Sequence, residues 1–431
     1  MTSTEAGAKP RDERDEVARP PGPSPSEAMM RMADPASAPW FMCEIEDTYP
    51  VLAHTVLRDE HAYVLTHPDA IVSVFIDHGR QTMKGHDLKG IEVDLGAQDR
   101  EGEAHVRHRR LAQPAFHRDR LDEYSIEMTT RALEHQQAWR EGATIDMQQS
   151  MGTLSLGIMG TTLFGTDMPI GTGTTQDTAA GLISALGPRM LMSHEPETPV
   201  EDRARGDMLS ILLALQEDGF GFADAAARNQ AITTLLGDPE PTAMNLTWAW
   251  ILLGQHPECA EWLYEELDAA LAGTTPCIED MERLPRMRAV LAESMRLYPP
   301  AWLEGRRLLT DIDIDGWLLP AGSLALASQF ALHRSERWWD GPSEFRPQRW
   351  LSHDGSFNEE APGQVRGAWF PFGWGSRRCI GERFAWTEAT LVLATLAQRW
   401  APRPATESAP SPWGALTLQV ATGARMTLHR R

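Results

Sequence analysis

The sequence predicts a mainly helical protein with a minor β region. Apolar residues recur at helical spacing from about residue 103 to 165, again from 229 to 271, and in the segment LPRMRAVLAESMRLYPP at 284–300. Strand signals are fewer. Residues 62–77 predict a strand, a turn and a helix start, and residues 311–330 predict strands around turns.

Length, charge and cysteine usage narrow the class of protein. A chain of 431 residues with 42% hydrophobic residues can bury a large core. Its net charge of -21 disfavours nucleic acid as a partner. The four cysteines include no pair at metal-ligand spacing, and such sparse usage is typical of a reducing cytosol, so we expect a cytoplasmic protein.

The N-terminal segment predicts a disordered tail over residues 1–28. It mixes charge, proline and small residues without apolar periodicity. No uncharged apolar run approaches the roughly 18 residues that a spanning helix needs, so we expect no membrane segment.

The most informative motif is FGWGSRRCIG at 372–381, directly before an apolar helical pattern. Glycines beside the cysteine would let the backbone approach a flat cofactor, and the following helix N-terminus and the arginines favour a thiolate. An isolated cysteine is usually only a small hydrophobe. The arrangement Phe-x-x-Gly-x-Arg-x-Cys-x-Gly, however, resembles the haem-binding signature of the cytochrome P450 family, with Cys379 at the axial-ligand position.

This resemblance implies a fold and an activity. The fold is a triangular helical prism that holds haem b between a long distal helix and the proximal cysteine loop, in a single catalytic domain over 29–431. The activity is oxidation of a small organic molecule of specialised metabolism, with electrons from ferredoxin and ferredoxin reductase. Two long helices normally cover the substrate mouth, and because 166–205 is short for them, we expect a reduced or rearranged lid.

The resemblance also implies partners for the two haem propionates. Arginine suits carboxylates because its planar fork donates two parallel hydrogen bonds. His105 and Arg109 resemble a His-x-x-x-Arg helix found in many bacterial members, and their spacing directs both side chains to one face. Arg306 and Arg377 match two further propionate positions.

Basic residues near the cysteine loop predict a docking surface for an acidic electron carrier. One group lies in the loop and the next helix, and a second group lies in a segment that the family places nearby. For each arginine taken alone, the alternative is an ordinary solvent-exposed charge with no role in docking. The set is Arg377, Arg378 and Arg383 together with Arg107, Arg109 and Arg110.

A Glu-x-x-Arg pair upstream of the loop predicts a structural network. Glu293 and Arg296 lie on one face of a predicted helix. Alone, such a pair is far more often a surface salt bridge. The family has this pair followed by a later arginine, which makes Arg349 the third member of a triad that serves folding and pocket integrity.

The distal helix departs from the family pattern. Most oxygen-activating members carry an acid followed by threonine there. Aligned on the LTW and QHPE motifs that follow, residues 237–242 read GDPEPT, so the acid is kept as Glu240 while Pro241 stands at the threonine position. Thr242 comes one residue later, and that step turns a side chain by about 100° around a regular helix.

The two prolines of this stretch predict a strong local kink. Pro239 and Pro241 each remove an intrahelical donor, at about 3 kcal/mol apiece in a helix interior. Glu240, Thr242 or the substrate would then supply protons to iron-bound dioxygen, a task for which the family uses the threonine hydroxyl. The alternative is a helix that ends early in a loop without a role.

Three functions therefore stay open. Oxygen-dependent monooxygenation is the default. The loss of the threonine favours, as an alternative, haem chemistry that needs no dioxygen cleavage, such as nitrene transfer, dehydration, rearrangement or peroxide-driven oxidation. A haem-binding sensor or carrier without catalysis is the third.

The resemblance also places a substrate pocket, which in such enzymes is mainly apolar. Glu304 stands where related sequences are commonly apolar, so it would meet an amine or hydroxyl of the substrate or else be a surface charge. The predicted lining is Leu236, Ala301, Trp302, Leu303 and Glu304, with the loop 83–95 and the helix face near Thr242.

Overall fold

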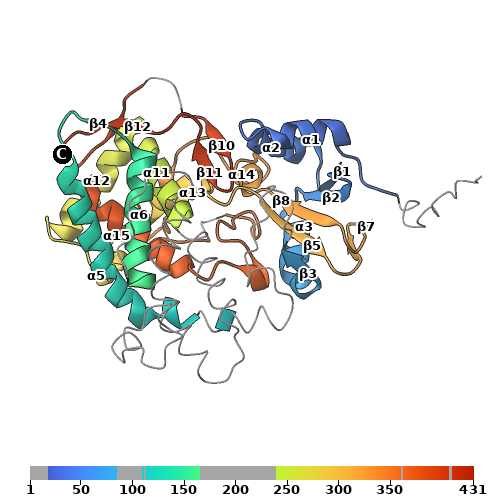
Figure 1. Ribbon diagram of the computed structural model, residues 1–431, viewed down its shortest axis with the longest axis horizontal. Coiled ribbons are helices and arrows are strands. Elements are labelled where there is room, and N and C mark those ends of the chain that lie inside the picture. The colour runs from blue at the N-terminus through green and yellow to red at the C-terminus, as the bar shows by residue number, and fades with distance from the viewer. Residues whose placement is uncertain (1–17, 85–108, 111–112, 166–238, 361–362, 407–409) are drawn as a thin grey trace, which may run out of the picture.

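Helices gather at one side of the molecule and a small sheet region at the other in the computed structural model (Figure 1). The structure describes residues 18–84, 109–110, 113–165, 239–360, 363–406 and 410–431. Within them, helical residues outnumber strand residues, which confirms the predicted mainly helical class with a smaller β region.

The helical side contains the largest hydrophobic cluster, which includes the fully buried Trp248 and Trp250. The helix over residues 147–164 has favourable ends. The Asp146 carboxylate accepts hydrogen bonds from the N–H groups of Gln148 and Gln149, and left-handed Gly165 ends that helix. The helices are α5 (Arg118–His135), α6 (Met147–Phe164), α11 (Pro239–Gln255), α12 (Pro257–Leu271), α13 (Pro285–Leu297) and α15 (Glu382–Ala397).

The α11 helix is the central member of this side. Every residue from 242 to 253 is buried, as expected for a helix that is apolar around its whole circumference. It contacts α6, α13 and α15, so a side chain on any face of α11 meets other protein.

The sheet region contains a five-stranded sheet in the order β1-β2-β8-β5-β3. The β2 and β8 strands run parallel, and the other neighbours are antiparallel. Pairing of Arg306 with Ala325 fixes which β5 side chains face the interior. The strands are β1 (Leu52–Leu57), β2 (Glu60–Leu65), β3 (Thr82–Lys84), β5 (Glu304–Leu308) and β8 (Leu324–Ala327).

Short helices pack around this sheet. The α2 and α14 helices contact each other, and Phe41 and Phe330 belong to one buried cluster beneath them. The α1 helix lies against β1. These helices are α1 (Pro25–Ala33), α2 (Ala38–Thr48), α3 (Pro68–Val72) and α14 (Gln329–Leu332).

A hairpin of β10 (Pro412–Gly414) and β11 (Leu418–Val420) lies between the two sides (Figure 1). The Trp248 indole N–H donates to the Leu418 carbonyl at 3.0 Å, and the Leu418 N–H donates to the Pro300 carbonyl at 3.0 Å. The hairpin therefore joins α11 to the segment that leads into β5. The remaining strands are β4 (Thr144–Asp146), β12 (Arg425–Thr427) and β9 (Arg403–Pro404) in one sheet, and β6 (Ile312–Ile314) with β7 (Trp317–Leu319).

One predicted boundary is wrong. The α1 helix begins at Pro25, capped by the Ser24 hydroxyl, and Ala28 is buried, so the last part of the predicted 1–28 tail is ordered. Backbone pairing also holds the chain before it, because the His54 N–H donates to the Pro21 carbonyl. The strand, turn and helix expected over 62–77 and the strands of 311–330 are confirmed.

Candidate functional site

The cysteine loop ends where α15 begins. Gly381 precedes Glu382, the first residue of the helix, and half-buried Cys379 lies just ahead of them. The Cys379 N–H donates to the Phe372 carbonyl at 2.8 Å, which closes the loop. The sulfur therefore lies near the positive end of the α15 dipole, where a thiolate is favoured.

Glycine at 375 is required by the packing of the protein itself. Its φ is +70°, and an added Cβ would lie 1.9 Å from the Phe75 carbonyl oxygen. Gly373, with φ of +68°, would place a Cβ 2.8 Å from Glu304 Oε1. Gly375 thus makes room for the backbone of residues 73–77, and the expected approach of the loop glycines to a flat cofactor stays a prediction.

Arg109 reaches the cysteine loop as predicted. Its Nη1 donates to the Arg378 carbonyl at 2.5 Å. Burial lowers the pKa of Arg109, while the nearby Cys379 sulfur, when charged, raises it. The side chain is thus close enough to Cys379 to stabilise its thiolate. His105, the other residue of this predicted pair, lies outside the described residues.

The predicted docking arginines differ in their surroundings. Arg378 donates to both carboxylate oxygens of Glu382, at 2.6 and 2.5 Å, so a carboxylate of its own helix start balances its charge. Arg110 and Arg383 are exposed, and Arg377 is half-buried in the loop. Arg107 lies outside the described residues.

Arg306 and Glu304 form an ion pair beside the loop. Arg306 Nη2 donates to Glu304 Oε1 at 2.8 Å, and the guanidinium lies 4.5 Å from the centre of the Phe75 ring. Glu304 Oε2 is buried and has no hydrogen-bond partner in the described part of the chain. The Glu304 carboxylate therefore faces Arg306 and Gly373, because pairing of β5 with β8 turns it there, and its contact with a substrate stays a prediction.

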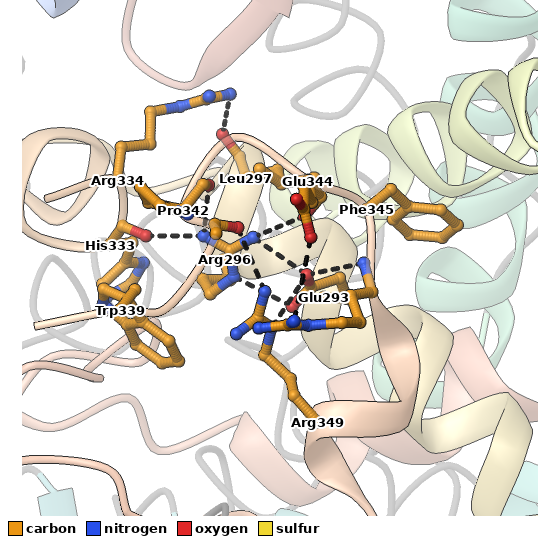
Figure 2. Close-up of polar contacts among 12 residues, drawn as sticks. Glu293, Arg296, Leu297, His333, Arg334, Trp339, Pro342, Glu344, Phe345 and Arg349 are labelled. Atoms are coloured by element: carbon orange, nitrogen blue, oxygen red, sulfur yellow. Dashed lines mark hydrogen bonds and ion pairs between the residues drawn. The ribbon is translucent and has the colours of Figure 1, made fainter. Parts of the chain in front are cut away.

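The Glu293 network is fully built (Figure 2). Arg296 Nε and Nη2 donate to the two Glu293 oxygens at 2.9 and 2.8 Å, and Arg349 Nε donates to Oε1 at 3.1 Å. The Trp350 indole N–H and the Arg346 backbone N–H complete the set, at 2.9 and 3.0 Å. Burial alone would raise the pKa of Glu293, but the two guanidinium groups outweigh burial and hold it below its usual range.

The same network extends toward the cysteine loop. Arg296 Nη1 donates to the His333 carbonyl at 2.8 Å, and the fully buried His333 ring accepts the Phe370 N–H at Nε2 over 3.3 Å. Phe370 is two residues before the loop. The predicted triad therefore positions the start of the segment that carries Cys379.

The distal acid is bound by the hairpin. Thr417 Oγ1 and Gln419 Nε2 each donate to Glu240 Oε1 at 2.6 Å. Pro239 and Pro241 lie in the first turn of α11 as described. The residues before Pro239 lie outside the described part of the chain, so the kink expected at these two prolines stays a prediction.

Comparisons with known proteins identify the family. The family described as Cytochrome P450 matches residues 188–420. Cyclooctatin synthase of Streptomyces melanosporofaciens is 35% identical over 350 residues, covering 73% of this chain and 74% of that protein. The chain belongs to the cytochrome P450 family.

Two further relatives of this P450 carry names that state an oxidation. Pentalenene oxygenase of Streptomyces avermitilis is 32% identical over 376 residues, covering 79% of this chain and 81% of that protein. Cyclooctat-9-en-7-ol 5-monooxygenase of Streptomyces melanosporofaciens is 30% identical over 430 residues, covering 86% of this chain and 91% of that protein. The P450 is therefore an enzyme with an oxidative role, which sets aside a sensor or carrier without catalysis.

The residues around the cysteine fit the haem that the family implies. A thiolate at a helix N-terminus is a suitable iron ligand. Arg109 contacts the cysteine loop directly, and Arg306 is linked to it through Glu304, which lies against Gly373. Guanidinium groups suit the carboxylates of propionates. In the described residues no helix is long and apolar enough to cross a membrane.

The predicted substrate residues of the P450 lie in different surroundings. Ala301 is exposed, whereas Leu303 and Trp302 are buried in the cluster beneath α2, and the Trp302 indole N–H donates to the Ala415 carbonyl at 3.0 Å. Thr242 is buried in the core. Leu236, the lid over 166–205 and most of the loop 83–95 lie outside the described residues.

Sequence reasoning missed Thr417 and Gln419. They follow Glu240 by 177 and 179 residues, and this part of the hairpin carries no catalytic motif. Gln419 lies in β11 and Thr417 immediately precedes it, so no local pattern connects either residue with Glu240.

Proposed function

We propose that this P450 catalyses oxygen-dependent monooxygenation of a small, mainly apolar organic molecule, with haem b bound through the Cys379 thiolate. The observation that carries the proposal is that Cys379 lies at the start of α15 in a loop that Arg109 contacts directly and that Arg306 meets through Glu304. The relatives' names denote an unsaturated hydrocarbon and an unsaturated alcohol, which support an alicyclic alkene or its alcohol in specialised metabolism as the substrate class.

Each part of the site has a role in the proposed reaction. The haem, when bound, supplies dioxygen activation. Cys379 would hold the haem iron through its thiolate, Arg109, Arg306, Arg377 and His105 would bind the propionates, and the Glu293 network holds the loop in place. One atom of dioxygen enters the substrate and the other leaves as water, so the reaction consumes two electrons and two protons. We infer that a ferredoxin, reduced by its reductase, supplies the electrons through the exposed Arg110 and Arg383. The cytoplasmic location and the single catalytic domain stay predictions.

The first test separates the cysteine's role from simple burial. Reduced protein with carbon monoxide is expected to give a thiolate-type Soret band, and Cys379→Ser is expected to abolish it. Cys277→Ser, at an exposed cysteine outside the loop, is the matched control and should keep the band. A Cys379→Ser protein with an unchanged band would overturn the proposed ligand.

Pro241 supports a second candidate, in which the enzyme performs haem chemistry that needs no dioxygen cleavage. The discriminating measurement is product formation with and without dioxygen and a ferredoxin system. Monooxygenation requires both, and the product gains an oxygen atom from labelled dioxygen. Product formation that continues without dioxygen, or without the ferredoxin system, would favour the second candidate. Product formation when hydrogen peroxide replaces both of them would indicate peroxide-driven oxidation.

A further inference from the structure

Position 241 points toward the β10–β11 hairpin. Residues seven apart share a face of an α-helix, so Pro241 lies on the face of Trp248. The Trp248 indole N–H donates to the Leu418 carbonyl at 3.0 Å. A side chain at 241 is thus directed to the hairpin, in which Thr417 immediately precedes β11.

Thr417 brings a hydroxyl to that face. The residue is 5% exposed, and its Oγ1 donates to Glu240 Oε1 at 2.6 Å. Gln419, on the same side of the strand, donates to the same oxygen at 2.6 Å. A hydroxyl that donates once still has two lone pairs that can accept.

Thr242 is not placed to bring its hydroxyl to this face of α11. It shares its face of α11 with Leu246 and Ala249, both completely buried in the largest hydrophobic cluster. The step from 241 to 242 turns the side chain by about 100°. Thr417 is therefore better directed than Thr242 to act with Glu240.

We propose that Thr417 supplies, from the hairpin, the hydroxyl that α11 lacks at position 241. Thr417 is a positioning residue: its donated hydrogen bond orients the Glu240 carboxyl group, and its lone pairs hold a water. A proton passes from the Glu240 carboxyl group through that water to the dioxygen atom that leaves as water, and solvent then reprotonates half-buried Glu240. This inference rests on the proposed oxygen-dependent function.

The test removes the hydroxyl and keeps the shape. Thr417→Val is expected to lower product formed per NADPH consumed by at least about tenfold, with the electrons appearing as hydrogen peroxide. Thr417→Ser keeps the hydroxyl and should restore most of the coupling. Thr247→Val is the matched control, because Thr247 is a fully buried threonine of α11 whose hydroxyl bonds only to the Ala243 carbonyl in the described structure.

A second readout does not require turnover. The urea midpoints of holoenzyme carrying Thr417→Val, Glu240→Leu or both form a double-mutant cycle. If the midpoint shift of the double variant differs from the sum of the two single shifts, the contact between Thr417 and Glu240 is supported. If the shifts add, that contact is overturned.

The outcomes separate the two proposals. Coupled wild type with uncoupled Thr417→Val supports both. Equal coupling in wild type and Thr417→Val overturns the role of Thr417 and leaves monooxygenation standing. A wild type that forms no product from dioxygen with any ferredoxin system overturns the proposed function, and the role of Thr417 falls with it.

Discussion

Glu293 in α13 and Glu240 in α11 are carboxylates on neighbouring helices, yet their surroundings differ completely. Glu293 is 0% exposed and accepts from two guanidinium groups, an indole and a backbone N–H. Glu240 is half-buried, and both of its hydrogen-bond donors within the described residues are neutral, a hydroxyl and an amide.

The difference shows how one residue type serves two purposes. Cationic donors in a dry interior hold a carboxylate ionised and in one orientation, which suits a structural role. A carboxylate held by neutral donors near solvent can take up and release a proton without breaking an ion pair, which suits proton delivery. Substitution of each glutamate by its amide tests this contrast directly.

The largest expected effect is that of Glu293→Gln. The amide leaves Arg296 and Arg349 as buried cations with no carboxylate, and breaking a buried pair costs about 3–5 kcal/mol of the free energy of unfolding. Urea unfolding of the holoenzyme measures the loss. Glu336→Gln, at an exposed glutamate, is the control and should change the free energy by less than about 0.5 kcal/mol. A cost below about 1 kcal/mol for Glu293→Gln would contradict the structural role.

Acidification should weaken the same region by a smaller amount. Burial, with the charge of Arg296, lowers the pKa of His333 to about 3. The unfolded chain binds a proton at this histidine below roughly pH 6.5, whereas the folded protein does not, so stability falls as pH drops. The contribution is about 1.4 kcal/mol per pH unit, or about 2 kcal/mol between pH 6.5 and 5.

His333→Gln isolates that contribution in urea unfolding measured at several pH values. Glutamine does not titrate, so the stability of the variant should fall less steeply between pH 6.5 and 5. His353→Gln, at an exposed histidine, should keep the wild-type slope. Identical slopes in His333→Gln and wild type would contradict the buried neutral ring.

Sequence predicted the Glu293 side of the molecule better than the Glu240 side, for a physical reason. The Glu293–Arg296 pair is fixed by helical spacing, so its geometry is local and readable. The indole of Trp350 and the carbonyl groups that receive Arg296 depend on how the chain returns to α13, which no spacing reveals. The missing threonine was equally visible as Pro241, but the partner of Glu240 lies 177 residues away.

Strand pairing explains where the structure places Glu304 near the loop. Glu304 was expected at substrate or solvent because of its place in the chain. The antiparallel register with β8 sets its direction, and Arg306, two residues later on the same strand, reaches its carboxylate. Such a pair on one strand is visible in sequence, whereas the approach of Gly373 to it is not.

The smallest expected change in stability is that of Glu240→Gln, and it completes the comparison with Glu293→Gln. The amide oxygen still accepts from Thr417 and Gln419, so the free energy of unfolding should fall by about 1 kcal/mol or less. Glutamine cannot deliver a proton, so product per NADPH should nevertheless fall at least about tenfold while peroxide rises. On one preparation, urea unfolding measures the free energy, and the amounts of product and hydrogen peroxide formed per NADPH consumed measure the coupling. A large loss of stability with unchanged coupling would reverse the assignment, making Glu240 a structural carboxylate like Glu293.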